Sequence, residues 1–122
     1  MFSSIFSKTP KMEWEGLSSN DQLDDVDKKS QEQPVILFKH STRCPISTMA
    51  LGRFERSYDH EVGFKPYFLD LIANREVSNG VADRYNVIHQ SPQVIVVKDG
   101  KAVYDASHNA INFEEIRDLI KN

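Results

Sequence analysis

The chain is 122 residues long, a length typical of one domain that buries a hydrophobic core of its own. With 39% hydrophobic and 27% charged residues it has the composition of an ordinary globular protein, and its apolar runs are too short to cross a bilayer. The formal net charge is −3 at pH 7, and Lys and Arg are scattered rather than clustered, which is unlike a nucleic-acid-binding protein. We therefore expect neither nucleic acid nor a membrane among its partners.

Cysteine usage and the amino end of the chain bear on the compartment. Cys44 is the only cysteine, so no internal disulfide can form, and the lack of a cysteine pair fits a reducing compartment. Residues 1–8 have neither the leading positive cluster nor the apolar stretch of a secretory signal. We therefore expect a cytoplasmic protein, with a flexible N-terminal tail at residues 1–11 and a single domain at residues 12–122.

The first third of the chain predicts a strand, a helix and a second strand. Residues 11–17 alternate apolar and charged positions, which is compatible with a short strand. Ser19 and Gln22 have the spacing of a capping box, and a polar helix is expected from there to about residue 29. Val35–His40 is an apolar run rich in β-formers, so it predicts a central strand covered on both faces.

The middle of the chain predicts helix, strand and helix in turn. A helix is expected to begin at Pro45, because proline at the first helical position gives up only an N–H that would be unpaired there. Its apolar face comprises Ile46, Met49, Ala50, Phe54 and Tyr58. Residues 65–71 then predict a strand and residues 74–85 a helix, although Gly80 weakens the middle of that helix. This order favours parallel strands joined by right-handed crossovers.

The last third predicts a hairpin and a closing helix. Gln93–Lys98 and residues 101–106 are apolar runs joined by Asp99-Gly100, a pair that tolerates the positive φ angles of a two-residue turn. Asn112 is a suitable cap for the final helix. The apolar residues at helical spacing there are Ile111, Ile116, Leu119 and Ile120. The sequence as a whole predicts an α/β fold with a mixed sheet.

The stretch FKHSTRCPIS places the only thiol in a polar loop between a predicted strand and a predicted helix. Only the thiolate attacks disulfides, and both a helix N-terminus and a neighbouring cation favour that anion. The amides of Ile46 and Ser47, in the turn opened by Pro45, would point toward the sulfur. Arg43 carries a permanent positive charge beside it. We therefore predict that Cys44 is a catalytic nucleophile whose thiolate is stabilised by this turn and by Arg43.

The element order, with Cys44 at the first turn after the central strand, resembles the thioredoxin fold, which has a C-terminal β-hairpin and helices on both faces of its sheet. Ser91-Pro92 stands where thioredoxin-like proteins carry a cis-proline loop facing the reactive sulfur. More narrowly, FKHSTRCPIS and HQSPQVIVVKDGK resemble the YtxJ family of bacillithiol-system proteins, the monothiol bacilliredoxins, over residues 14–119. The resemblance implies a monomeric thiol–disulfide oxidoreductase that takes bacillithiol from S-bacillithiolated client proteins, with bacillithiol as co-substrate and no bound cofactor.

Position 47 indicates a single-thiol cycle. Dithiol oxidoreductases have a second cysteine three residues after the attacking one, whereas Ser47 offers a hydroxyl, which can hydrogen-bond a thiolate but cannot displace it. The cycle must therefore end with a low-molecular-weight thiol or a partner's cysteine. Phe38 stands where thioredoxins usually carry a buried acid, and its apolar side chain fits a single-thiol cycle. A protonated His40 would add to the positive field, although a packed or solvated role is more common for such an imidazole.

The same resemblance suggests where substrates bind. A cis bond before Pro92 would leave the Ser91 backbone free to pair with an extended client segment. The side chains of Thr42, Arg43 and Gln93 could line a groove for the small thiol. In that groove Arg43 or a nearby lysine would meet carboxylates such as the malate portion of bacillithiol.

Other functions stay open at this stage. A monothiol-glutaredoxin-like iron–sulfur carrier would use Cys44 of two subunits with two small thiols, and a non-catalytic thioredoxin-fold redox adaptor would use no thiol chemistry. Cys44 could also be an inert buried residue, although its polar neighbours argue against that. No mononuclear metal site is expected, because ligand spacing is missing from the four histidines: His40, His60, His89 and His108.

Overall fold

The computed structural model describes residues 12–121, so the tail expected at residues 1–11 lies outside the described part. The elements are β1 (Glu15–Gly16), α2 (Gln22–Glu32), β2 (Val35–His40), α3 (Pro45–Ser57), η1 (His60–Val62), β3 (Lys65–Asp70), α4 (Arg75–Tyr85), β4 (Gln93–Lys98), β5 (Lys101–Ser107), η2 (His108–Ala110) and α5 (Phe113–Lys121). The predicted order of strands and helices is confirmed, and the two short 3₁₀ helices η1 and η2 are additions that the sequence did not indicate.

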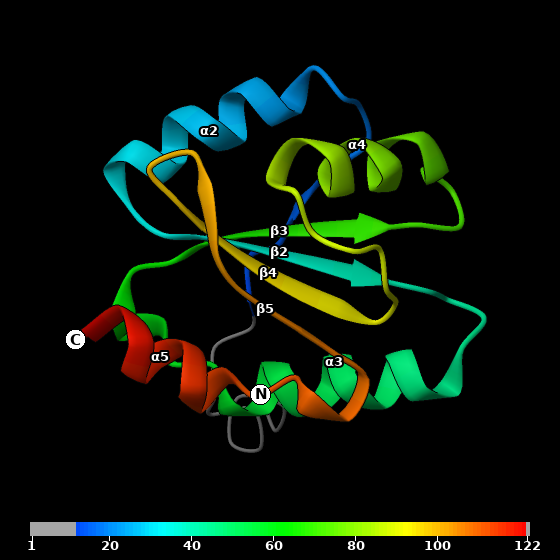
Figure 1. Cartoon of the computed structure of the whole chain (residues 1–122). Coiled ribbons are helices and arrows are strands. Elements are labelled where there is room, and N and C mark those ends of the chain that lie inside the picture. Colours follow the sequence, from blue (N-terminus) through cyan, green and yellow to red (C-terminus); the bar gives the residue numbers. More distant parts are fainter. Residues whose placement is uncertain (1–11, 122) are drawn as a thin grey trace, which may run out of the picture.

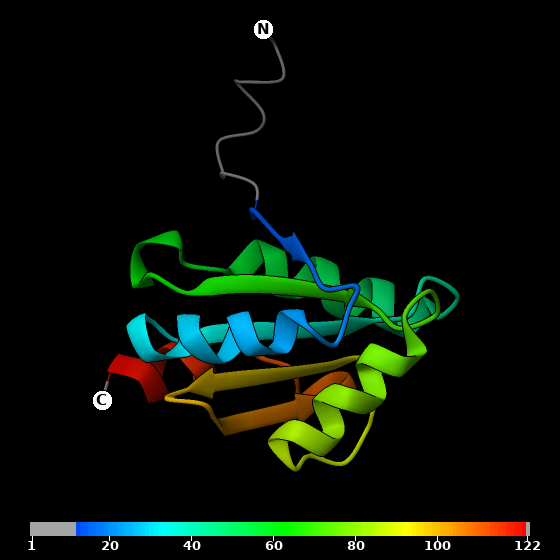
Figure 2. The ribbon, with the colours of Figure 1, turned by 90° about the horizontal axis from the view of Figure 1, so that it is seen from above.

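The five strands form one mixed sheet in the order β1-β3-β2-β4-β5, which Figure 2 shows from above. The central strand β2 pairs parallel with β3 and antiparallel with β4, and the β4–β5 hairpin closes that side. Asp99 and Gly100 both have positive φ, 53° and 76°, as the predicted two-residue turn requires. The mixed sheet with a C-terminal hairpin is therefore confirmed.

Helices cover both faces of the sheet (Figure 1): α2 and α4 lie on one face, and α3 and α5 lie on the other. Side chains alternate along β2, so Val35 and Leu37 enter the first core while Ile36 and Phe38 enter the second. The core under α2 and α4 is mainly aliphatic. The core against α3 and α5 is aromatic, with Phe38, Phe54, Tyr58, Phe64 and Phe113 in contact.

The helix starts follow local hydrogen bonds. The Asn112 carboxamide oxygen accepts from the amides of Glu114 at 2.8 Å and Glu115 at 3.4 Å, which confirms the predicted cap of α5. At α2, the Gln22 carboxamide oxygen accepts from the Ser19 amide at 3.0 Å. The Ser19 side chain gives no reciprocal bond, so only one half of the predicted capping box forms, and α2 begins at Gln22.

Helices α2 and α4 pack closely over the sheet. A Cβ at Gly80 of α4 would meet the Asn20 side chain just before α2, so a larger residue there would require that exposed side chain to move. Arg84 donates to the Asp27 carboxylate at 3.0 Å and the Tyr85 hydroxyl donates to it at 2.6 Å. These contacts tie α4 to α2 along one side.

The topology brings four chain segments to one end of the sheet. Strands β2, β3 and β5 end there and β4 begins there, because Lys39 of β2 pairs with Gln93 of β4, and Gln93 pairs with Ser107 of β5. We call this end the Cys44 edge, since the loop to α3 also starts from it. No helix within residues 12–121 combines the length and apolar character that a transmembrane span needs.

Candidate active site

Cys44 lies at the junction between the loop after β2 and helix α3. Its amide donates to the Ser41 carbonyl at 3.2 Å, which closes a turn, and its own carbonyl accepts from the Thr48 amide at 3.1 Å, the first bond of the helix. Cys44 is thus the N-cap of α3, with extended backbone angles of −114° and 114°, and Pro45 begins the helix. The thiol is partly exposed. The helix dipole therefore acts at the sulfur-bearing residue itself.

The cationic and polar neighbours of Cys44 are exposed. Thr42 and Arg43 both face solvent, as does Pro45. Within residues 12–121 the Arg43 guanidinium makes no ion pair with a carboxylate. Its charge is therefore free to act on the sulfur or on an incoming anionic group.

Ser47 is fully buried, and its hydroxyl is committed to the loop rather than to the sulfur. The Ser41 amide donates to Ser47 Oγ at 3.0 Å, and Ser47 Oγ lies 2.7 Å from His40 Nδ1. Because the hydroxyl oxygen already accepts from Ser41, its own proton can be donated to Nδ1 of a neutral imidazole. Ser47 therefore holds the loop before Cys44 in place, and only its backbone amide remains in the first turn of α3.

His40 is buried beneath this loop, with its ring 5.5 Å from that of Phe68. Burial lowers the pKa of His40, and the carboxylates of Asp70 and Glu55 only partly oppose that effect. The imidazole is therefore neutral near pH 7 and adds no positive field to the thiol. Nowhere in residues 12–121 do three His, Cys, Asp or Glu side chains gather as metal ligands would.

The Ser91-Pro92 peptide bond is cis, and the pairing of Lys39 with Gln93 places it beside the end of β2, at the Cys44 edge. Pro92 is buried, and its carbonyl accepts from the His108 amide at 3.0 Å. The Ser91 hydroxyl oxygen is buried and has no hydrogen-bond partner within the described residues. The segment before β4 therefore lies at the same edge as the thiol, as the sequence predicts.

Gln93 lies beneath this segment rather than in an open groove, with only 1% of its surface exposed. Its carboxamide donates to the Ile88 carbonyl at 2.9 Å and accepts from the Gln90 amide at 3.4 Å. The side chain therefore shapes the segment from inside, which differs from the groove-lining position expected from the sequence.

Large apolar side chains are exposed around the Cys44 edge. Ile46 and Met49, the latter 68% exposed, are in the first turns of α3, Ile72 follows β3, and Ile88, 81% exposed, precedes β4. The sequence placed Ile46 and Met49 on the buried face of the helix. This was wrong, because the face of α3 that packs on the sheet is the one with Ser47, Ala50 and Phe54, and Ile46 and Met49 lie beside that face.

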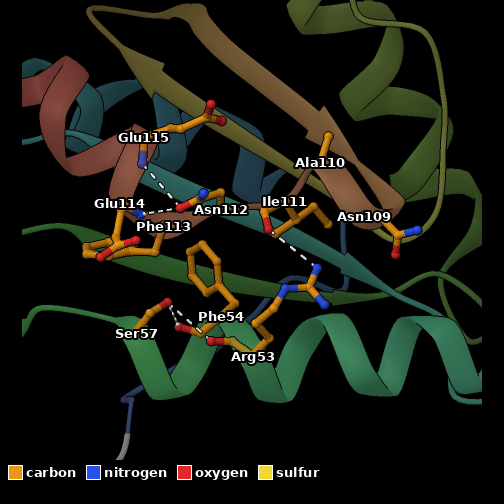
Figure 3. A pocket seen from close by; sticks show the side chains of 10 residues that line it. All are labelled: Arg53, Phe54, Ser57, Asn109, Ala110, Ile111, Asn112, Phe113, Glu114 and Glu115. Atoms are coloured by element: carbon orange, nitrogen blue, oxygen red, sulfur yellow. Dashed lines mark hydrogen bonds between the residues drawn. The ribbon is translucent and has the colours of Figure 1, made fainter.

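A cavity of about 400 Å³ lies elsewhere, between α3, η2 and the start of α5 (Figure 3). The Arg53 guanidinium donates across it to the carbonyls of Ile111 at 3.4 Å and His108 at 3.5 Å. At a helical rise of 1.5 Å per residue, Arg53 is roughly 13 Å along α3 from Cys44. This cavity is therefore not the place of any chemistry at the sulfur.

Comparison with known proteins agrees with this geometry. Residues 15–116 match the family model of the monothiol bacilliredoxin BrxC. A solved protein with a thioredoxin fold is 30% identical, with a TM-score of 0.75 over 88% of this chain and 93% of that one. The thioredoxin of Trypanosoma brucei brucei, 17% identical, has a TM-score of 0.71 over 94% and 97% of the two chains. That of Malassezia sympodialis, also 17% identical, has 0.69 over 93% and 92%. The fold is thus that of thioredoxin, and the chain belongs to the monothiol bacilliredoxin family.

Proposed function

We propose that this chain is a cytoplasmic thiol–disulfide oxidoreductase that removes bacillithiol from S-bacillithiolated protein cysteines through a mixed disulfide on Cys44. One observation carries the proposal. The only thiol is partly exposed at the N-cap of α3, and the residue three positions later is a buried serine engaged with His40 and Ser41. Such a site can attack a disulfide but cannot resolve the product within the same chain.

The reaction is a pair of disulfide exchanges. In the first, the Cys44 thiolate attacks the bacillithiol sulfur of the client's mixed disulfide, the old S–S bond breaks, and the client thiolate leaves and takes a proton from water. In the second, a further low-molecular-weight thiol attacks the same bacillithiol sulfur on Cys44. This step releases the Cys44 thiolate and forms a small-molecule disulfide, so that thiol supplies the reducing equivalents. The ratio of free thiol to disulfide sets the direction of transfer.

The surface at the Cys44 edge suits a protein client. The apolar side chains Ile46, Met49, Ile72 and Ile88 offer contact area to a folded or extended partner. The Ser91 backbone, just before β4, would pair with an extended client segment as an added strand does. Arg43 and Thr42, exposed beside the thiol, are available to the carboxylates and hydroxyls of the small thiol.

Intact mass spectrometry tests the proposal directly. A client protein carrying one bacillithiol adduct is mixed with the wild-type chain or with Cys44→Ser, without added small thiol. We expect the adduct mass to move from the client to the wild-type chain and to stay on the client with Cys44→Ser. A client left unchanged by both chains would contradict the proposal, and slow reaction of Cys44 with a chromogenic disulfide would then indicate a non-catalytic adaptor.

A further inference from the structure

A buried polar cluster lies behind the segment that leads to Pro92, and the sulfur chemistry does not use it. Lys39, at the end of β2, is fully buried, and its ammonium donates to the Ser78 carbonyl of α4 at 3.0 Å. The Ser78 hydroxyl, also fully buried, lies 2.8 Å from Nε2 of His89. A continuous path of contacts thus connects the central strand, α4 and the segment before β4.

Burying this cluster lowers the free energy of unfolding. Burial lowers the pKa of Lys39 to about 8, and burial together with the Lys39 charge lowers the pKa of His89. The residues of β2 that precede Lys39 on the same face, Val35 and Leu37, are apolar, and an apolar residue at position 39 would avoid the cost of burying a charge. Apolar packing alone therefore does not explain the lysine at this position.

Several polar contacts hold the segment that the cluster reaches, and the cluster supplies one of them, the His89–Ser78 contact to α4. Residues 86–92, which we call the docking loop, begin with Asn86 in the left-handed conformation and expose Ile88. Val87 is its only residue packed against the aliphatic core in the described part of the chain. On its inner side the loop is bonded by the His89 imidazole and by the Gln93 carboxamide. Polar contacts, more than apolar packing, fix the path of this loop.

We propose that Lys39, Ser78 and His89 form a positioning cluster that sets the docking loop, and with it the Ser91 backbone, for protein clients. The cluster acts on docking and leaves the reactivity of Cys44 to the separate contacts of His40 and Ser47. This inference rests on the proposed function, because it assigns residues to the binding of its client.

The test compares His89→Ala, His89→Gln and Lys39→Met with the wild-type chain. For transfer from an S-bacillithiolated client protein, we expect KM to rise roughly five- to tenfold in His89→Ala and Lys39→Met, as the loss of a buried hydrogen bond implies. His89→Gln keeps a side-chain nitrogen for Ser78 and should restore most of the binding. Alkylation of Cys44 by iodoacetamide should stay within about twofold in all three variants. Lys39→Met should raise the melting temperature while it weakens docking, a combination that a purely structural lysine would not produce.

Hydrogen exchange separates this inference from the proposed function. In His89→Ala we expect the backbone amides of residues 86–91 to exchange roughly tenfold faster, with no change at residues 41–48. Unchanged exchange in the docking loop would overturn the cluster's positioning role. Faster exchange with an unchanged KM would overturn its role in docking. If the wild-type chain transfers no bacillithiol at all, the proposed function fails, and the exchange experiment still decides whether the cluster positions the loop.

Discussion

Two loops meet at the Cys44 edge, and they are held in different ways. The loop of residues 41–44 is fixed by His40 through Ser47, a neutral pair on the aromatic side of the sheet. The docking loop is contacted from the other side by Lys39 through Ser78 and His89, a cluster that contains a buried charge. Lys39 and His40 are neighbours in β2 and point to opposite faces. The end of β2 thus contributes to the support of both loops through contacts on opposite faces of the sheet, and we expect the two supports to act independently.

Ser47→Ala should have the largest effect, and it tests whether the two loops are supported independently. The variant leaves the part-buried Ser41 amide and the buried His40 Nδ1 without their partner, which should cost about 1–3 kcal/mol of unfolding free energy and slow Cys44 alkylation roughly tenfold. Chemical denaturation and stopped-flow alkylation measure the two effects. Thr48→Ala is the matched control, because its exposed hydroxyl makes only a 3.5 Å contact with the Cys44 carbonyl. A client KM that rises as much as the alkylation rate falls would show that the two loops are not independent.

Lys39→Met tests the support of the docking loop, through the effect of the buried Lys39 charge on the unfolding free energy. The folded state holds the pKa of Lys39 at about 8, below its ordinary 10.5, so the unfolded chain binds a proton more readily between these values. Wild-type stability therefore rises as the pH increases from 8 to 10.5. We expect the variant to unfold with roughly 2 kcal/mol more free energy at pH 7, and this advantage to shrink over that range. Denaturant titrations at pH 7 and pH 10 measure it, and a constant difference would contradict the assignment.

Asn112→Ala changes a position away from both loops, so it separates the effect of lower overall stability from the effect of altering a loop. It removes the oxygen that caps α5 and should lower the unfolding free energy by about 1 kcal/mol. Transfer kinetics and Cys44 alkylation should stay at wild-type values. Asn112→Asp restores a capping oxygen and should recover the stability. Impaired transfer in a folded Asn112→Ala chain would mean that global stability, rather than the two loops, controls activity.

The smallest expected effect is a dependence of stability on mildly acidic pH. Burial lowers the pKa of both His40 and His89, so below about pH 6.5 the unfolded chain takes up protons that the folded chain does not. The unfolding free energy should therefore fall as the pH drops from 7 to 5. In His40→Gln or His89→Gln the slope over this range should be about half of the wild-type slope. Equal slopes in all three chains would mean that other groups dominate.

The sequence predicted the helices and strands well because the boundaries of each depend mainly on residues close by in the chain. The apolar run at β2, the proline at the start of α3 and the Asp99-Gly100 turn give the observed boundaries. The position of Cys44 follows from two of these boundaries. Which residues hold the two loops could not be predicted from the sequence, because His89 meets Ser78 and Lys39 meets α4 only through tertiary packing. The run at β2 predicted a strand covered on both faces, but it did not show that Lys39 and His40 have buried partners.

The hydrogen bonds of Ser47 bear on how such a protein could change over evolutionary time. A single codon change to cysteine at this position would place a sulfur where Ser41 and His40 now find a strong acceptor and donor, and a thiol is weak in both capacities. An ancestor or descendant with two cysteines would therefore need another partner for His40 Nδ1 and for the Ser41 backbone amide. The contacts of Ser47 with positions 40 and 41 thus tie the serine at this position to the shape of the loop before Cys44.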